Sequence, residues 1–280
     1  MTYTYRNILV HIDNSPRRQT RIDLAIQMTS EFGAHLTGLY LVYQQMSYPY
    51  GPEVMLEGLV AEQERLMKQK RDAAEQAFTE SARRAGLTVE WRAPAGNAAN
   101  VAPVHARYAD LTLVGQSDPD DPETFVAEGF PELLVLSAGR PVLFVPYAGP
   151  VPGRFGTVLV AWNGSREGTR AVTDALPLLQ RADKVYVVSV NPKIGEREHG
   201  EVPGADIALY LARHGVAAEV TQVKGADIDA GELLLSQAAD LGAELIVTGA
   251  YGHARFREVI LGGVTRTLLK HMTVPVFMSH

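Results

Sequence analysis

The sequence predicts an α/β protein with two tandem open sheets, each mostly parallel, five-stranded and covered by helices on both faces. Three observations lead to this class. Short β-branched apolar runs, such as residues 7–12, alternate with helical segments, as in parallel strands that are buried on both faces. A Gly- and Pro-rich join spans residues 147–153. After that join the same order of segments starts again.

The first half of the chain begins with a strand and a helix. The apolar run 7–12 predicts the strand. Ser15 is expected to cap the helix, with Pro16 at its first position. Gly33 is expected to end the helix. Residues 60–85 have strong helix propensity and predict a long helix after a loop. Further strands are expected at 35–42, 88–92, 111–115 and 140–146, the loop at 43–58, and further helices at 98–107 and 130–138.

The second half repeats the first. Residues 157–165 match residues 7–15 at a constant offset of 150, and residues 244–249 match 110–115 at a constant offset of 134. Two constant offsets indicate a tandem repeat of one α/β unit. Ser165 again stands at the cap position of a helix. Domains are expected at 1–147 and 154–280, further strands at 184–190, 217–223 and 274–278, and helices at 171–179, 207–214 and 231–241.

The composition excludes several classes of function. Without any cysteine the chain has no disulfide, thiolate zinc site or Cys nucleophile. A net charge of -6 argues against a general affinity for nucleic acid or for an anionic membrane surface. No apolar run reaches the roughly 18 residues that a membrane-spanning helix needs. The N-terminus leads into a strand without the apolar region of a signal peptide, so we expect a cytoplasmic protein.

A glycine-rich stretch follows the apolar strand at 244–249. Gly249, Gly252 and Gly262 are spaced as Gly-x2-Gly-x9-Gly. Glycines directly after a buried strand let backbone N–H groups approach a ligand, and a helix that starts nearby adds the positive end of its dipole. This combination suits a phosphate group, although glycines also serve turns and helix caps.

The first half does not keep this stretch. At the offset of 134, Gly252 corresponds to Asp118, Gly262 to Glu128, and Thr265 to Pro131. Carboxylates repel phosphate, and their side chains block a close approach of the backbone. We therefore expect the first half to bind a nucleotide poorly.

These features together resemble a tandem universal stress protein with two UspA-type domains. The resemblance rests on the strand-and-turn starts at 8–15 and 158–165, on the glycine stretch, and on the closing Val274-Pro275-Val276. It implies an adenine-nucleotide alpha hydrolase-like fold, with a degenerate first domain. It also implies phosphate contacts or base and ribose contacts from residues of the second half, which are Asn163, Val190, Gly249, Gly252, His253, Gly262, Gly263, Val264 and Thr265.

Two positions depart from the nucleotide-binding pattern of that family. Gly263 stands where a Ser or Thr usually follows the third glycine, and Asn163 replaces the usual Asp at the first turn. Each lost hydrogen bond is worth about 0.5–1.5 kcal/mol, so affinity falls without vanishing. The hydroxyl of Thr265 offers partial compensation.

No catalytic constellation or metal-ligand set is present in the sequence, which lacks a Gly-x4-Gly-Lys-Ser/Thr loop, a nucleophile elbow and a His-Glu-x2-His motif. We therefore expect a stress-response binding or regulatory protein that takes ATP or a related adenine nucleotide, with Mg²⁺ accompanying the nucleotide but not required. A slow ATPase, a small-molecule hydrolase and a ligand-free scaffold are the alternatives. The resemblance also implies pairing of the two halves through 142–145 and 276–278. A homodimer and an unidentified protein partner are further expectations.

Overall fold

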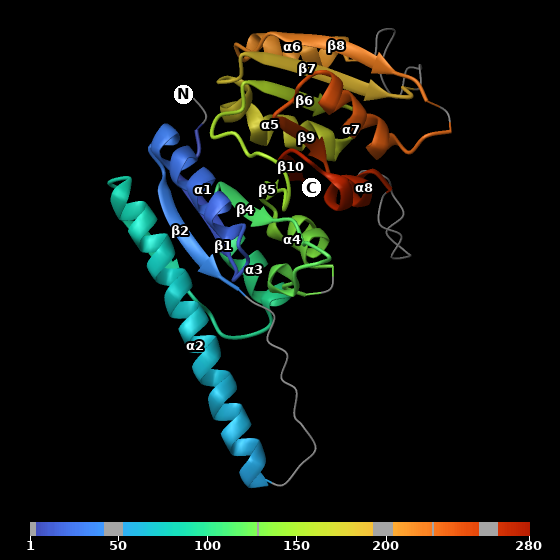
Figure 1. Ribbon diagram of the computed structural model, residues 1–280. Helices are drawn as coiled ribbons and strands as arrows, with labels where there is room; N and C mark the ends of the chain where they lie inside the picture. The colour runs from blue at the N-terminus through green and yellow to red at the C-terminus, as the bar shows by residue number, and fades with distance from the viewer. Residues whose placement is uncertain (1–3, 42–52, 128, 193–203, 226, 252–262) are drawn as a thin grey trace.

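One ten-stranded sheet runs through the molecule (Figure 1). The computed structural model describes residues 4–41, 53–127, 129–192, 204–225, 227–251 and 263–280. The strands are β1 (Asn7–Ile12), β2 (His35–Tyr40), β3 (Val89–Arg92), β4 (Leu111–Gly115), β5 (Val142–Val145), β6 (Thr157–Ala161), β7 (Lys184–Val190), β8 (Ala218–Val223), β9 (Leu245–Gly249) and β10 (Val276–Ser279).

The order of the strands confirms the predicted class and the repeat. The sheet runs β3-β2-β1-β4-β5-β10-β9-β6-β7-β8, so that each half contributes five strands in the same relative order. Every pairing within a half is parallel. In each half the direction in which successive strands are added to the sheet reverses between the first and fourth strands, which are β1 and β4 or β6 and β9. These reversals are the points where open α/β sheets bind ligands.

Helices cover both faces of the sheet. Buried side chains of α1, α2, α5 and α6 join one core cluster, and those of α3, α4, α7 and α8 join the other. The helices are α1 (Arg18–Phe32), α2 (Glu53–Arg84), α3 (Ala98–Ala106), α4 (Phe130–Ala138), α5 (Arg166–Leu179), α6 (Ala205–Arg213), α7 (Ala230–Asp240) and α8 (Gly263–His271), with the short 3-10 helix η1 at Pro122–Thr124.

Two local predictions were wrong. The helix α2 begins at Glu53, well before residue 60, so the expected loop at 43–58 is partly helical; residues 42–52 lie outside the described part. Ser15 does not cap α1, which starts only at Arg18. Its hydroxyl instead donates to Oδ1 of Asp13 at 2.7 Å, and that hydrogen bond fixes the turn before the helix.

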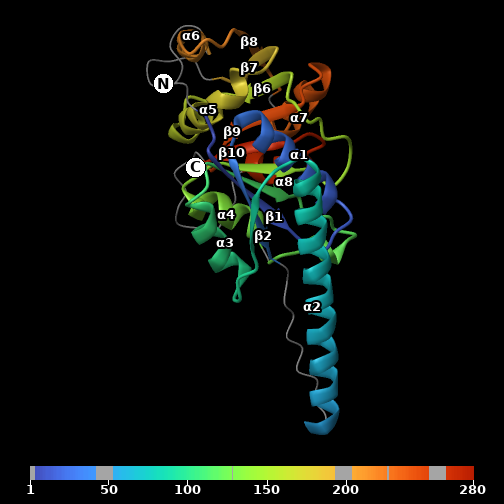
Figure 2. The same ribbon diagram turned by 90° about the vertical axis from the view of Figure 1, so that its left-hand side faces the viewer.

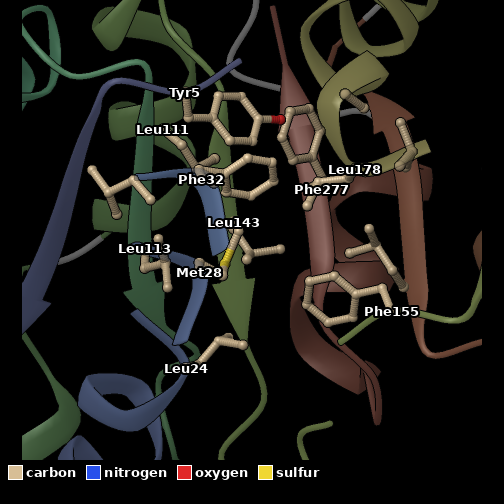
Figure 3. Close-up of a cluster of buried hydrophobic side chains, with 14 of the residues drawn as sticks. Tyr5, Leu24, Met28, Phe32, Leu111, Leu113, Leu143, Phe155, Leu178 and Phe277 are labelled. Atoms are coloured by element: carbon tan, nitrogen blue, oxygen red, sulfur yellow. The ribbon is translucent and has the colours of Figure 1, made fainter. Parts of the chain in front are cut away.

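The two halves are joined through their last strands. β5 and β10 pair antiparallel, with Val276 opposite Phe144 and Met278 opposite Val142, so that neither edge stays open. Side chains of both halves pack together on one face of this seam (Figure 3). The ring centroids of Phe32 in α1 and Tyr5 are 5.0 Å apart. The guanidinium carbon of Arg181, which follows α5, lies 4.4 Å from the centroid of the Phe32 ring.

No helix in the described part of the chain is both long enough and apolar enough to cross a membrane.

Candidate functional site

The reversal between β6 and β9 brings several of the predicted residues to one edge of the sheet. Ala161 pairs with Thr248, so Asn163, just after β6, lies beside Gly249, the last residue of β9. Val190 ends the adjacent strand β7, and α8 begins at Gly263. Asn163 and Gly263 are exposed, and Val190 is half-buried. Gly252, His253 and Gly262 lie outside the described residues, so their expected phosphate contacts stay predictions.

Asn163 builds the turn between β6 and α5. Its Oδ1 accepts hydrogen bonds from the backbone N of Ser165 at 3.1 Å and from its hydroxyl at 2.7 Å. The Ser165 Oγ in turn accepts from the backbone N of Gly168 at 3.1 Å, which confirms Ser165 as the cap of α5. The side-chain oxygen of Asn163 is therefore used by the turn, and its amide nitrogen is the group left to meet a ligand.

Gly249 is needed where α5 meets the end of β9. A Cβ at Gly249 would overlap the backbone N of Gly168 and would lie 2.5 Å from the backbone carbon of Glu167. The first turn of α5 thus packs directly on the backbone of β9. This packing explains the glycine without a ligand, and a phosphate contact from Gly249 stays a prediction.

Thr265 and Val264 contribute to the packing of α8. The hydroxyl of Thr265 accepts from the backbone N of Tyr251 at 3.4 Å, and the side chain is only 3% exposed. Tyr251 has a backbone φ of 61° in the loop that leaves β9, so this contact fixes a left-handed turn. Val264 is partly buried against the core cluster of α7 and α8. The Thr265 hydroxyl is therefore already engaged with the backbone.

Asp229 is a residue of this region that the sequence reasoning missed. Its Oδ1 caps α7 by accepting from the backbone N of Gly231 at 2.9 Å and of Glu232 at 3.3 Å. Its Oδ2 would lie 3.3 Å from a Cβ at Gly263, which is closer than most such contacts. A side chain at position 263 would require this carboxylate to shift by a few tenths of an ångström. An Asp before a helix indicates a cap in any sequence, but its approach to α8 depends on how α7 and α8 pack.

The equivalent edge in the first half is filled by Arg21. Its Nη2 lies 2.8 Å from Oδ2 of Asp13, and its Nε donates to the backbone O of His11 at 2.8 Å. A Cβ at Gly115 would overlap Nη1 of the same guanidinium. Asp13, Ser15 and Arg21 are at most 2% exposed. The side chain of Arg21 therefore occupies the strand ends that are exposed around Asn163 in the second half, where position 171 is Ala.

Burial and neighbouring charges set the protonation states of Asp13 and His11. Burial alone would raise the pKa of Asp13, but Arg21, His11 and the two hydrogen bonds from Ser15 together hold that pKa below its usual value. Burial lowers the pKa of His11 to about 4, opposed in part by the charge of Asp13. The neutral ring donates from Nε2 to the backbone O of Leu41 at 2.9 Å, and within the described residues Nδ1 has no partner.

The described residues contain no group of three or more His, Cys, Asp or Glu side chains placed to hold a metal ion. Two acids of the 116–124 loop accept hydrogen bonds from the backbone of the loop itself. Asp118 Oδ1 accepts from the N of Asp120 at 3.0 Å, and Asp121 Oδ1 accepts from the N of Glu123 at 3.0 Å.

Comparisons with known proteins agree with this fold. A model of the universal stress protein family matches the chain twice, at residues 4–146 and 154–280. A crystal structure of a universal stress protein from Archaeoglobus fulgidus DSM 4304 is similar in fold, with a TM-score of 0.72 and 17% identity over 98% of this chain and 95% of that one. A functionally unknown protein of Pseudomonas aeruginosa PAO1 is similar with a TM-score of 0.64 and 16% identity, over 98% of this chain and 92% of that one. No curated protein matches the sequence.

Proposed function

Because the chain belongs to the universal stress protein family, we propose that it is a stress-response binding protein whose second half takes an adenine nucleotide without dedicated catalysis. One observation carries the proposal. The two halves share a fold, but the strand ends are filled by Arg21 in the first half and exposed around Asn163 and Gly263 in the second. Ligands of open α/β sheets bind at such strand ends, so the second half is the one that can admit a ligand.

The expected pose follows from the groups available at this edge. The base or ribose would lie near Asn163 and the end of β7 at Val190, where an amide nitrogen and backbone groups can form hydrogen bonds. The phosphates would lie toward the first turn of α8, at Gly263 and Val264, where backbone N–H groups and the helix dipole favour an anion.

Asp229 limits how much negative charge this pose can accept. Its carboxylate lies beside the first residue of α8, where the phosphates are expected. Two like charges about 4 Å apart repel by about 1 kcal/mol in water and by more near a protein surface. We therefore expect nucleotides with fewer phosphates to lose less affinity than ATP, and Mg²⁺ bound with ATP to reduce the difference.

The test combines calorimetry with a charge placed at the first turn of α8. Adenosine, AMP, ADP and ATP are titrated into the full chain and into a Gly263→Asp variant, and hydrolysis of ATP is followed in parallel. The added carboxylate repels phosphate, and because it also faces the carboxylate of Asp229, thermal unfolding is measured to confirm that the variant is folded. Ala205→Asp places the same charge at the first residue of α6, which is also exposed, and serves as the matched control.

We expect the wild type and Ala205→Asp to bind phosphorylated adenosine and Gly263→Asp to lose that binding. The absence of heat with every nucleotide would favour a ligand-free scaffold. Hydrolysis of ATP that Gly263→Asp abolishes would favour an enzyme on the same fold.

A further inference from the structure

The first half of α2 extends beyond the body of the protein. The helix has 32 residues, and Figures 1 and 2 show its N-terminal part projecting away from the sheet. Its anchor is near the other end, where Ala74, Phe78 and Ala82 are fully buried. Phe78 packs against Gly38 of β2, where a Cβ would lie 2.8 Å from the ring. Residues 53–73 span about 30 Å, and none of the described side chains at 58–73 is buried.

The projecting part carries apolar side chains on one face. Leu59 and Leu66 are seven residues apart, as are Val60 and Met67, so each pair lies on the same side of the helix. Leu59 is 57% exposed, Leu66 is 46% exposed and Val60 is 39% exposed. A helix without tertiary support is marginal in water, because most helical stability in proteins comes from packing an apolar face. This face therefore lacks the cover that such a long helix normally has.

The same stretch is sharply divided in charge. Residues 53–64 contain four Glu and no basic residue, and residues 65–71 contain two Arg, two Lys and no acidic residue. The helix dipole does not account for the basic block, since dipole effects are confined to the first and last turns and this block lies near the middle of α2. The ion pairs that the block forms within the described chain, Arg65 with Glu62, Lys70 with Glu123 and Arg71 with Asp72, are solvent-exposed and easily exchanged.

We propose that the projecting part of α2 binds the same part of a second copy of this chain in an antiparallel pair. An antiparallel arrangement places the acidic segment 53–64 of each copy on the basic segment 65–71 of the other, around a seam of Leu59, Val60, Leu66 and Met67. A parallel pair would set acid against acid and base against base. The segment is complementary to itself in one orientation only, which is what a twofold contact between identical surfaces requires.

The contact is small and its assembly should depend on concentration. A single pair of helices of this length buries less than the roughly 800 Å² per partner of a standard interface. We therefore expect a reversible equilibrium between monomer and dimer that shifts toward monomer as salt increases, because the charged segments are exposed and screened.

Analytical ultracentrifugation over a range of concentrations tests the surface. We expect wild type to form a dimer and the Leu59→Glu/Leu66→Glu double variant to remain monomeric. Both positions are exposed in the single chain, so the substitutions leave its fold intact. Leu209→Glu introduces the same change at a 51% exposed position of α6 and should leave the dimer unchanged. A wild type that stays monomeric overturns the proposal, as does a dimer that the double variant retains.

Cross-linking tests the orientation, because the chain has no cysteine of its own. Val60→Cys and Met67→Cys each place one thiol on the seam, on either side of the boundary between the two charged segments. In the antiparallel pair, mild oxidation should form a disulfide between the two variants when they are mixed and should not join either variant to itself. A disulfide of Val60→Cys with itself would indicate a parallel pair and contradict the proposal.

Discussion

Arg21 and Asp13 form an ion pair that is closed off from solvent, with Nη2 and Oδ2 2.8 Å apart and side-chain exposures of 3% and 2%. The second half has Ala171 and Asn163 at the equivalent positions, so it has neither the cation nor the second carboxylate oxygen. The turn itself is the same in both halves, because Oδ1 of Asp13 and Oδ1 of Asn163 each accept from the N and the hydroxyl of the serine two residues on. The loss of both members of this ion pair thus accompanies the change from a filled strand end to an exposed one.

Replacing Arg21 by Met should destabilise the protein strongly. The change leaves the carboxylate of Asp13 buried without its cation, and breaking such a pair costs about 3–5 kcal/mol. Urea unfolding measures the loss. The double variant Arg21→Met/Asp13→Asn removes both charges and keeps the oxygen that Ser15 needs, so it should recover much of the stability. A double variant no more stable than Arg21→Met would show that the buried charge is not the cause.

The stability of the protein should fall on mild acidification because of His11. Its pKa is about 4 in the folded protein, compared with 6.5 for an exposed histidine, so the unfolded chain binds a proton first as the pH falls. The stability gained from the neutral ring is complete above pH 6.5 and is lost as the pH falls toward 4. The loss is on the order of 3 kcal/mol.

His11→Gln provides the comparison for this pH dependence. Glutamine keeps a donor for the backbone O of Leu41 but does not titrate, so the unfolding free energy should change less between pH 6.5 and 4. Asp13 adds its own dependence in both proteins, because its lowered pKa makes it destabilising to protonate at still lower pH. Equal slopes for the two proteins between pH 6.5 and 4 would exclude His11 as the source.

Gly249→Ala should destabilise the protein even in the absence of any ligand. The added methyl group meets the backbone of Gly168 and Glu167, which cannot move aside as a flexible side chain can. Overpacking of this kind typically costs about 1–3 kcal/mol. Gly263→Ala is the control, since its nearest neighbour is the Asp229 carboxylate at 3.3 Å and the position is exposed. If thermal unfolding shows equal effects for the two variants, close packing of α5 is not the reason for Gly249.

Asp229→Asn should tighten the binding of phosphorylated nucleotides. Asparagine caps a helix as well as aspartate does, so α7 is retained while a negative charge next to α8 is removed. Relief of about 1 kcal/mol of repulsion corresponds to about a fivefold gain in affinity for ATP. Calorimetry with adenosine should show no gain, because adenosine carries no phosphate. An equal gain for both ligands would mean that Asp229 does not face the phosphates.

The sequence by itself determined the class of the fold and its repeat. Buried parallel strands are apolar on both faces, so each strand forms a short continuous apolar run in the sequence. The two constant offsets identify the repeat without any coordinates. Ser165 was recognised as a helix cap for the same reason, since a cap depends on residues close together in the chain.

Only the tertiary structure decided what the strand ends hold. The sequence placed Ser15 at the start of α1 because Pro16 follows it, but α1 starts only at Arg18 and the side chain of Arg21 folds back over Gly115. Asp229 reaches α8 because α7 and α8 pack together, and Gly249 meets α5 because β9 lies beside β6. These contacts join residues far apart in the chain, and local patterns carry no information about which distant side chain fills a given space.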